Sequence, residues 1–165
     1  MGFSPGGEFK AAVEEGRKIG AKILLGDRDV DATLAALYTS IVSTTPQQLD
    51  GLNARLNELL QGTGGEGRDF LGPGTAGEIS KSEITSFMEK IKTRDNITKM
   101  TNAMKAEAPM IYRALIGDRD AFMAEAIAGS DFNNLVGVVG FAHVVGIEAK
   151  MGALGWKLVK RNCPI

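Results

Sequence analysis

The hydrophobic positions of this chain follow helical spacing over long stretches, interrupted by two short apolar runs. Apolar residues recur every three or four positions along residues 8–20, 29–43 and 45–59, which predicts three helices. Residues 21–25 (AKILL) and 135–139 (LVGVV) are instead continuously apolar. Such short runs are typical of strands that are buried on both faces of a sheet.

Helical spacing returns in the second half of the chain. It predicts helices over residues 80–106, 118–128 and 142–154. Residues 61–77 are rich in glycine and predict a long flexible loop. The order of these elements predicts an α/β fold, with a helix-rich layered domain around a small, mostly parallel sheet. Two strands make a poor sheet, so we expect either further strands that the pattern conceals or a domain that is incomplete at its N-terminus.

Composition indicates an ordinary globular chain with a single domain over residues 1–165. The 19 basic and 20 acidic side chains leave a net charge of −1, which gives no electrostatic footprint for nucleic acid. No apolar run reaches the roughly 20 residues that a transmembrane helix needs. The single cysteine, Cys163, cannot form an intrachain disulfide, which is compatible with a reducing compartment such as the cytoplasm.

Several common catalytic motifs are excluded. One histidine rules out HExxH and Cys2His2 zinc sites, one cysteine rules out CxxC, and there is no Walker A sequence. Residues 2–6 (GFSPG) do match the GxSxG motif of serine hydrolases. However, the residue after the serine is Pro5, which has no backbone N–H to offer to an oxyanion hole, so we reject this interpretation.

The residues best suited to chemistry follow the two predicted strands. Arg28 comes shortly after residues 21–25, and His143 shortly after residues 135–139. Ligands of open parallel sheets bind beyond the carboxyl ends of the strands, so we expect these two side chains at one edge. An imidazole can bind a metal or transfer a proton, and a guanidinium can stabilise an oxyanion. Glu8, at the start of the first predicted helix, could add a carboxylate.

Each of these residues also has a purely structural explanation, and the sequence leaves both open. His143 would hydrogen-bond to loop carbonyls, and Glu8 would favour the positive end of its own helix. Arg28 would pair with one of three carboxylates that are close in sequence or in a related motif: Asp27, Asp29 and Asp118.

A short sequence occurs twice. LLGDRD at residues 24–29 recurs as LIGDRD at residues 115–120. In both copies the glycine can form a turn, and the aspartates can cap the helix that follows and complement its dipole. An anion could also bind at the start of the helix after the first copy, but the flanking aspartates already supply negative charge there.

Two blocks of the chain resemble the TraB/PrgY family, which is related to the Tiki proteins. Residues 6–34 contain a Gly-Glu helix start, a predicted strand, Gly-Asp-Arg-Asp and a Thr-Leu helix. Residues 116–147 contain an acid-Arg-Asp helix with a following methionine, then a predicted strand leading to Gly-x-x-His and Gly-Ile. Asp118 stands where relatives usually have glutamate. The family's first Gly-x-x-His motif is missing, so we expect a truncated or fragmentary copy.

The resemblance implies a metal-dependent peptide hydrolase. Glu8, Arg28 and His143 match the family's glutamate, its arginine and its second Gly-x-x-His motif, and are the expected catalytic residues. Glu8 and His143 would bind a divalent metal ion, and Arg28 would stabilise the oxyanion formed from a peptide substrate. Because one motif is missing, the alternative is a non-catalytic binding or regulatory protein with a protein partner. The eukaryotic branch of the family implies the mitochondrial outer membrane as a second possible location.

Overall fold

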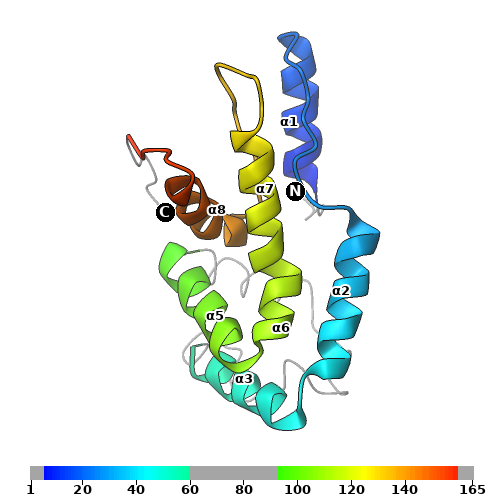
Figure 1. The fold of residues 1–165 in the computed structure, drawn as a ribbon, viewed down its shortest axis with the longest axis vertical. Helices are drawn as coiled ribbons and strands as arrows, with labels where there is room; N and C mark the ends of the chain where they lie inside the picture. The colour runs from blue at the N-terminus through cyan, green and yellow to red at the C-terminus, as the bar shows by residue number, and fades with distance from the viewer. Residues whose placement is uncertain (1–5, 60–92, 160–165) are drawn as a thin grey trace.

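The computed structural model describes residues 6–59 and 93–159, and all regular elements in these ranges are helical. They are α1 (Gly7–Lys18), α2 (Val30–Ser43), α3 (Pro46–Leu59), α5 (Arg94–Glu107), α6 (Pro109–Tyr112), the π-helical turn η1 (Arg113–Gly117), α7 (Asp118–Ala128), the 3-10 turn η2 (Phe141–His143) and α8 (Val144–Ala153) (Figure 1). The predicted glycine-rich loop at 61–77 and the start of the helix predicted at 80–106 lie outside the described residues.

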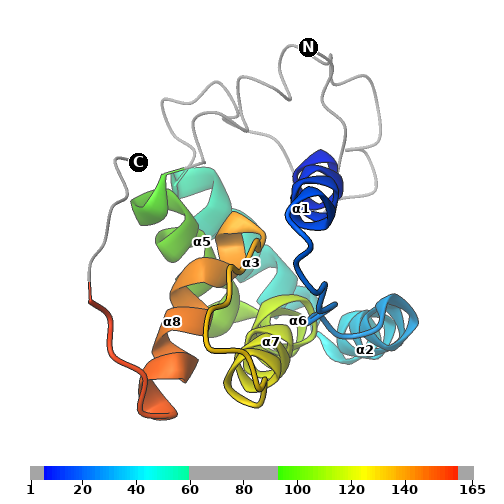
Figure 2. The ribbon, with the colours of Figure 1, turned by 90° about the horizontal axis from the view of Figure 1, so that it is seen from above.

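One long rod, formed by α6, η1 and α7, organises the packing (Figure 1). Viewed along its length in Figure 2, α2 lies on one side of this rod and α8 on the other. α3 packs against α5, and α7 packs against α8. Two small hydrophobic cores result, and their buried members are Leu52, Ala103, Ala108 and Ile111 in one and Met123, Ala124 and Ile147 in the other.

Local sequence signals explain where the first helices begin and end. Gly20, just beyond α1, adopts a φ of 70°, a left-handed conformation that glycine tolerates best. The side chain of Asp29 accepts hydrogen bonds from the backbone N–H groups of Asp31 (2.9 Å) and Ala32 (3.2 Å) and so caps α2. The aspartate of the first Gly-Asp-Arg-Asp copy therefore acts as the helix cap that the sequence predicted.

The predicted sheet, and with it the α/β fold class, is wrong for this structure. Residues 21–25 and 135–139 are neither helix nor strand, and the described ranges contain no strand at all. No backbone hydrogen bond joins these two segments. Their apolar side chains are not buried either, since Leu25 is 85% and Val136 is 91% exposed. A strand needs a neighbour that satisfies its backbone groups, and an apolar run does not itself supply one.

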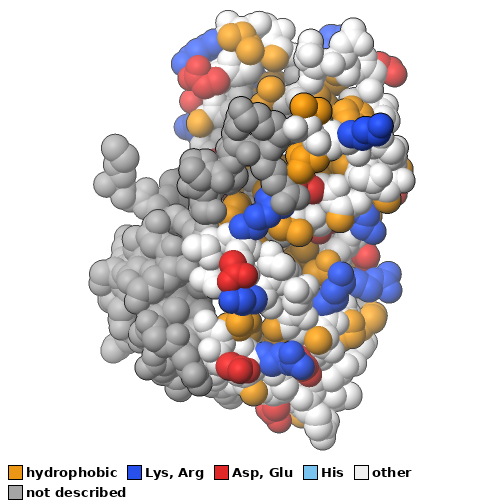
Figure 3. All heavy atoms as spheres, turned by 90° about the vertical axis from the view of Figure 1, so that its left-hand side faces the viewer, with side chains coloured by type: hydrophobic (Ala, Val, Ile, Leu, Met, Phe, Trp, Pro, Cys, Tyr) orange, Lys and Arg blue, Asp and Glu red, His pale blue; other side chains and the backbone are white. Residues whose placement is uncertain are grey.

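Exposed hydrophobic side chains are not confined to these two segments. Hydrophobic side chains are also exposed on the face drawn in Figure 3. Within residues 6–59 and 93–159, no helix has both the length and the apolar character needed to cross a bilayer.

Candidate functional site

A buried pair of polar side chains lies where α7 meets α8. His143 Nδ1 is 2.7 Å from Asp120 Oδ1, and the two side chains are only 10% and 2% exposed. Asp120 comes from the first turn of α7, and His143 from the end of η2, where the chain enters α8. Gly146, in the first turn of α8, leaves room for this carboxylate: a Cβ at that position would lie 1.8 Å from Asp120 Oδ2.

This pairing favours one tautomer of the neutral imidazole. When the neutral ring donates its Nδ1–H to Asp120, Nε2 keeps a lone pair that can accept a proton or bind a metal. A carboxylate behind a histidine fixes the ring in this way in metal sites and in hydrolytic triads. The structural alternative, a histidine bonded to loop carbonyls, is not the arrangement observed.

Arg28 lies in the loop before α2 and reaches the central rod. Its Nε donates to Thr33 Oγ1 at 3.3 Å, and its Nη2 donates to the carbonyl oxygen of Ala114 at 3.4 Å. Both acceptors are neutral, so the described contacts leave the positive charge of this guanidinium without a carboxylate partner. Such a side chain is available to an anionic group of a ligand.

The carboxylates that were expected to neutralise Arg28 have other roles. Asp29 caps α2, and Asp118 lies 3.4 Å from Arg113 Nε. The side chain of Asp27 pairs with Arg119 instead, although it also accepts the backbone N–H of Arg28 at 2.7 Å. The simple ion-pair explanation of Arg28 is therefore wrong for the described side chains.

Asp27 and Arg119 form a two-pronged ion pair. Arg119 Nε donates to Asp27 Oδ1 at 3.1 Å, and Arg119 Nη2 donates to Oδ2 at 2.5 Å. The Arg119 side chain lowers the pKa of Asp27 below its ordinary value of 3.8, although partial burial acts in the opposite direction. The backbone N–H of Arg28, the charge of Arg119 and, when the ring is protonated, the charge of His143 lower this pKa further. In return, the hydrogen bond to Asp27 raises the pKa of Arg119.

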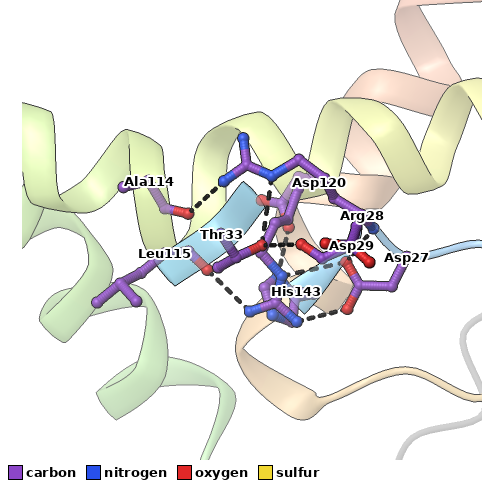
Figure 4. A network of polar contacts seen from close by, with 9 residues as sticks. Asp27, Arg28, Asp29, Thr33, Ala114, Leu115, Asp120 and His143 are labelled. Atoms are coloured by element: carbon purple, nitrogen blue, oxygen red, sulfur yellow. Dashed lines mark hydrogen bonds and ion pairs between the residues drawn. The ribbon is translucent and has the colours of Figure 1, made fainter. Parts of the chain in front are cut away.

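Figure 4 shows these groups side by side, as a network drawn from three parts of the chain: the hydrogen bonds around Asp27, Arg28 and Arg119, and beside them the separate pair of His143 and Asp120. Arg28 and His143, which the sequence predicted to lie together, are both in it. Glu8 is not part of its contacts: it is exposed in the first turn of α1, a helix that buries none of its side chains. The role of Glu8 as a catalytic residue and metal ligand stays a prediction.

The described residues do not by themselves fit a divalent metal ion. Nowhere in the ranges 6–59 and 93–159 do three or more His, Cys, Asp or Glu side chains gather as possible ligands. Within the network, Asp27 is bound to Arg119, Asp29 caps α2 and Asp120 is bound to His143, whose Nε2 could bind a metal ion. A single imidazole does not make a metal site of the usual three or four protein ligands.

The sequence-based prediction gave no site role to Arg119 and Asp120, although both lie in the repeated sequence and Asp120 gave a second signal. α7 buries Asp120 together with Met123 and Ala124, which follow it by three and four positions. An aspartate therefore stands on the apolar face of a helix, where a carboxylate requires a partner. Helical spacing could have identified it, but not its partner.

Comparison with known proteins supports the family resemblance. The chain is 29% identical over 151 residues to an uncharacterized protein of Methanocaldococcus jannaschii, and the alignment covers 89% of this chain and 32% of that protein. It is 27% identical over 166 residues to TraB domain-containing proteins of mouse and human, with 90% of this chain and 38% of those proteins covered. The chain thus spans about a third of the length of these curated relatives. No solved structure matches it. The model of the TraB/PrgY/gumN family matches residues 66–158, more than half of the chain, and the protein therefore belongs to this family.

Proposed function

We propose that this chain carries part of the catalytic site of a peptide hydrolase, centred on His143. The observation that supports the proposal is the buried 2.7 Å pair between His143 and Asp120 in a network that also holds Arg28. A buried carboxylate lies behind the only histidine, near an arginine that pairs with no carboxylate among the described residues. The two together combine a proton acceptor with a group for a developing negative charge.

The network residues have distinct roles in this proposal. Nε2 of His143 takes a proton from a water molecule, whose oxygen attacks the carbonyl carbon of the peptide bond. Asp120 stabilises the imidazolium that forms, and the N–H groups of Arg28 stabilise the negative charge on the carbonyl oxygen. When the carbon–nitrogen bond breaks, His143 returns the proton to the leaving amine.

A divalent metal ion and Glu8 enter the proposal through the family alone. Such an ion would polarise the carbonyl and activate water when bound. Because the described donors do not fit it, no step above depends on it. Equilibrium dialysis against Zn²⁺ or Mn²⁺, with Glu8→Gln and His143→Gln variants, tests both assignments. Binding that neither substitution weakens would exclude these residues as ligands.

The catalytic proposal is tested by cleavage of a peptide library, followed by mass spectrometry, with and without added Zn²⁺ or Mn²⁺. We expect His143→Gln to reduce turnover by about 10²–10⁴-fold, the usual contribution of a general base. Arg28→Gln should also reduce turnover, by about 10²–10³-fold. The matched control is Arg113→Gln, which removes an exposed arginine of η1 outside the network. Equal turnover in wild type and His143→Gln would refute the proposal.

A second candidate is a non-catalytic binding or regulatory protein. It is favoured by the lack of any group of three metal donors among the described residues. Affinity capture with wild type and His143→Gln separates the candidates, because a binding role requires the same specific partners in both. If the source is eukaryotic, association with the mitochondrial outer membrane belongs to this candidate, and fractionation of isolated mitochondria tests it.

A further inference from the structure

The two copies of the Gly-Asp-Arg-Asp sequence, residues 26–29 and 117–120, contact each other in the folded chain (Figure 4). Arg119 of the second copy binds Asp27 of the first, across 92 positions of sequence. In the opposite direction, Arg28 of the first copy reaches the carbonyl oxygen of Ala114, just before the second copy. Helix capping accounts for Asp29 alone, so the repeat has a further role.

Asp27 connects Arg119 to Arg28. Its carboxylate receives two hydrogen bonds from the Arg119 side chain, at 3.1 and 2.5 Å. The same carboxylate accepts the backbone N–H of Arg28 at 2.7 Å. Because a charged, two-pronged pair has a narrow geometry, it fixes the backbone from which the Arg28 side chain extends.

The π-helical turn η1 anchors both arginines. The carbonyl oxygen of Ala114 accepts from Arg28 at 3.4 Å, and that of Leu115 accepts from Arg119 at 3.1 Å. These are consecutive carbonyls, so both guanidinium groups are held against one short piece of backbone. π-Helical turns are rare and are frequently found at functional sites.

We propose that Arg119 is a positioning residue, which acts through Asp27 and η1 to fix the orientation of the Arg28 guanidinium. Its neighbour Asp120 holds His143, so adjacent residues of α7 position two separate groups of the site. The importance of Arg28 rests on the proposed function, but its orientation can be measured without turnover. A lysine at position 119 would keep the charge and lose the planar pair of donors.

The test is NMR of the ¹⁵N-labelled full chain, in which the Nε–H signal of Arg28 is assigned from Arg28→Lys. In Arg119→Gln and in Asp27→Asn, we expect exchange of this proton with solvent to rise on the order of 10-fold. The double variant should show no larger effect, because both substitutions remove the same bond. Arg119→Lys should restore only part of the protection. Arg113→Gln is the matched control and should leave the signal unchanged.

The ring signals of the single histidine provide a separate check, since they report on the bond to Asp120. They should still report this bond in all these variants, which shows that the fold persists. Unchanged Arg28 exchange in Arg119→Gln would overturn the positioning role, as would additive effects in the double variant. If Arg119→Gln does not fold, Asp27→Asn and Arg119→Lys still decide the question. Absence of peptide cleavage would refute the proposed hydrolase and leave this measurement intact.

Discussion

Replacement of Gly146 by alanine tests the geometry of the His143–Asp120 pair directly. The added Cβ would lie 1.8 Å from Oδ2 and 2.6 Å from Cγ of Asp120, distances at which one group must move. The carboxylate has little freedom, because Asp120 is 1% exposed and its other oxygen contacts His143. We therefore expect Gly146→Ala to push Asp120 away from the imidazole.

Three contributions set the size of the effect. Overpacking a close contact costs about 1–3 kcal/mol. Weakening a buried hydrogen bond to a charged group costs a further 1.5–3 kcal/mol or so. Alanine gains up to about 1 kcal/mol over glycine inside a helix, with the opposite sign. The net expectation is a loss of roughly 1.5–6 kcal/mol in the free energy of unfolding.

The assay is urea unfolding followed by circular dichroism, with Gly152→Ala as the matched control. Gly152 lies in the same helix, and a Cβ there would meet nothing within 4 Å. The control should therefore be neutral or slightly stabilising, so only Gly146→Ala is expected to destabilise the fold. NMR of the histidine ring should show a changed environment in Gly146→Ala alone. Stabilisation by Gly146→Ala, with unchanged histidine signals, would refute the contact between α7 and α8 described above.

Further predictions concern the stability of the fold in acid and the truncation of one buried and one exposed apolar side chain. Because the pKa of Asp27 is lower in the folded chain than its ordinary 3.8, its ionised form stabilises the fold above that value, and this contribution disappears as the pH falls through the folded pKa. The stability difference between wild type and Asp27→Asn, measured by urea unfolding, should thus be present at pH 7 and shrink below about pH 4; a constant difference would contradict the ion pair with Arg119. Leu52→Ala should cost about 2–5 kcal/mol, because this side chain is 2% exposed in the core. Val136→Ala should change stability by less than about 0.5 kcal/mol, because Val136 is 91% exposed, and a large loss would show that this segment is buried after all.

Local sequence was sufficient where a feature depends on neighbours along the chain. The three- and four-residue spacing predicted helices that coincide closely with α1, α2, α3, α7 and α8. The cap at Asp29 and the helix end at Gly20 followed from residues within one turn of them. These features arise from backbone hydrogen bonds and side-chain caps over three or four positions, so a linear pattern contains the required information.

For the candidate site, the sequence supplied the family and part of the residue set. The two blocks that resemble the family identified Arg28 and His143, and the structure places both in the network of Figure 4. Glu8 came from the same resemblance, but no described contact joins it to them. Asp120 could have been suspected from its place on the apolar face of α7, and Arg119 from its place in the repeated Gly-Asp-Arg-Asp sequence, but no local signal gave the partner of either.

Only the tertiary structure decided which partners these residues have. Asp27 and Arg119 are 92 positions apart, and Asp120 and His143 are 23 apart, so each pair depends on how whole helices pack. The same reason explains the wrong sheet: residues 21–25 and 135–139 have strand-like composition, but a strand exists only when another backbone pairs with it. Composition determines which segments tend to be helical or extended, and packing over long sequence distances determines what each of them meets.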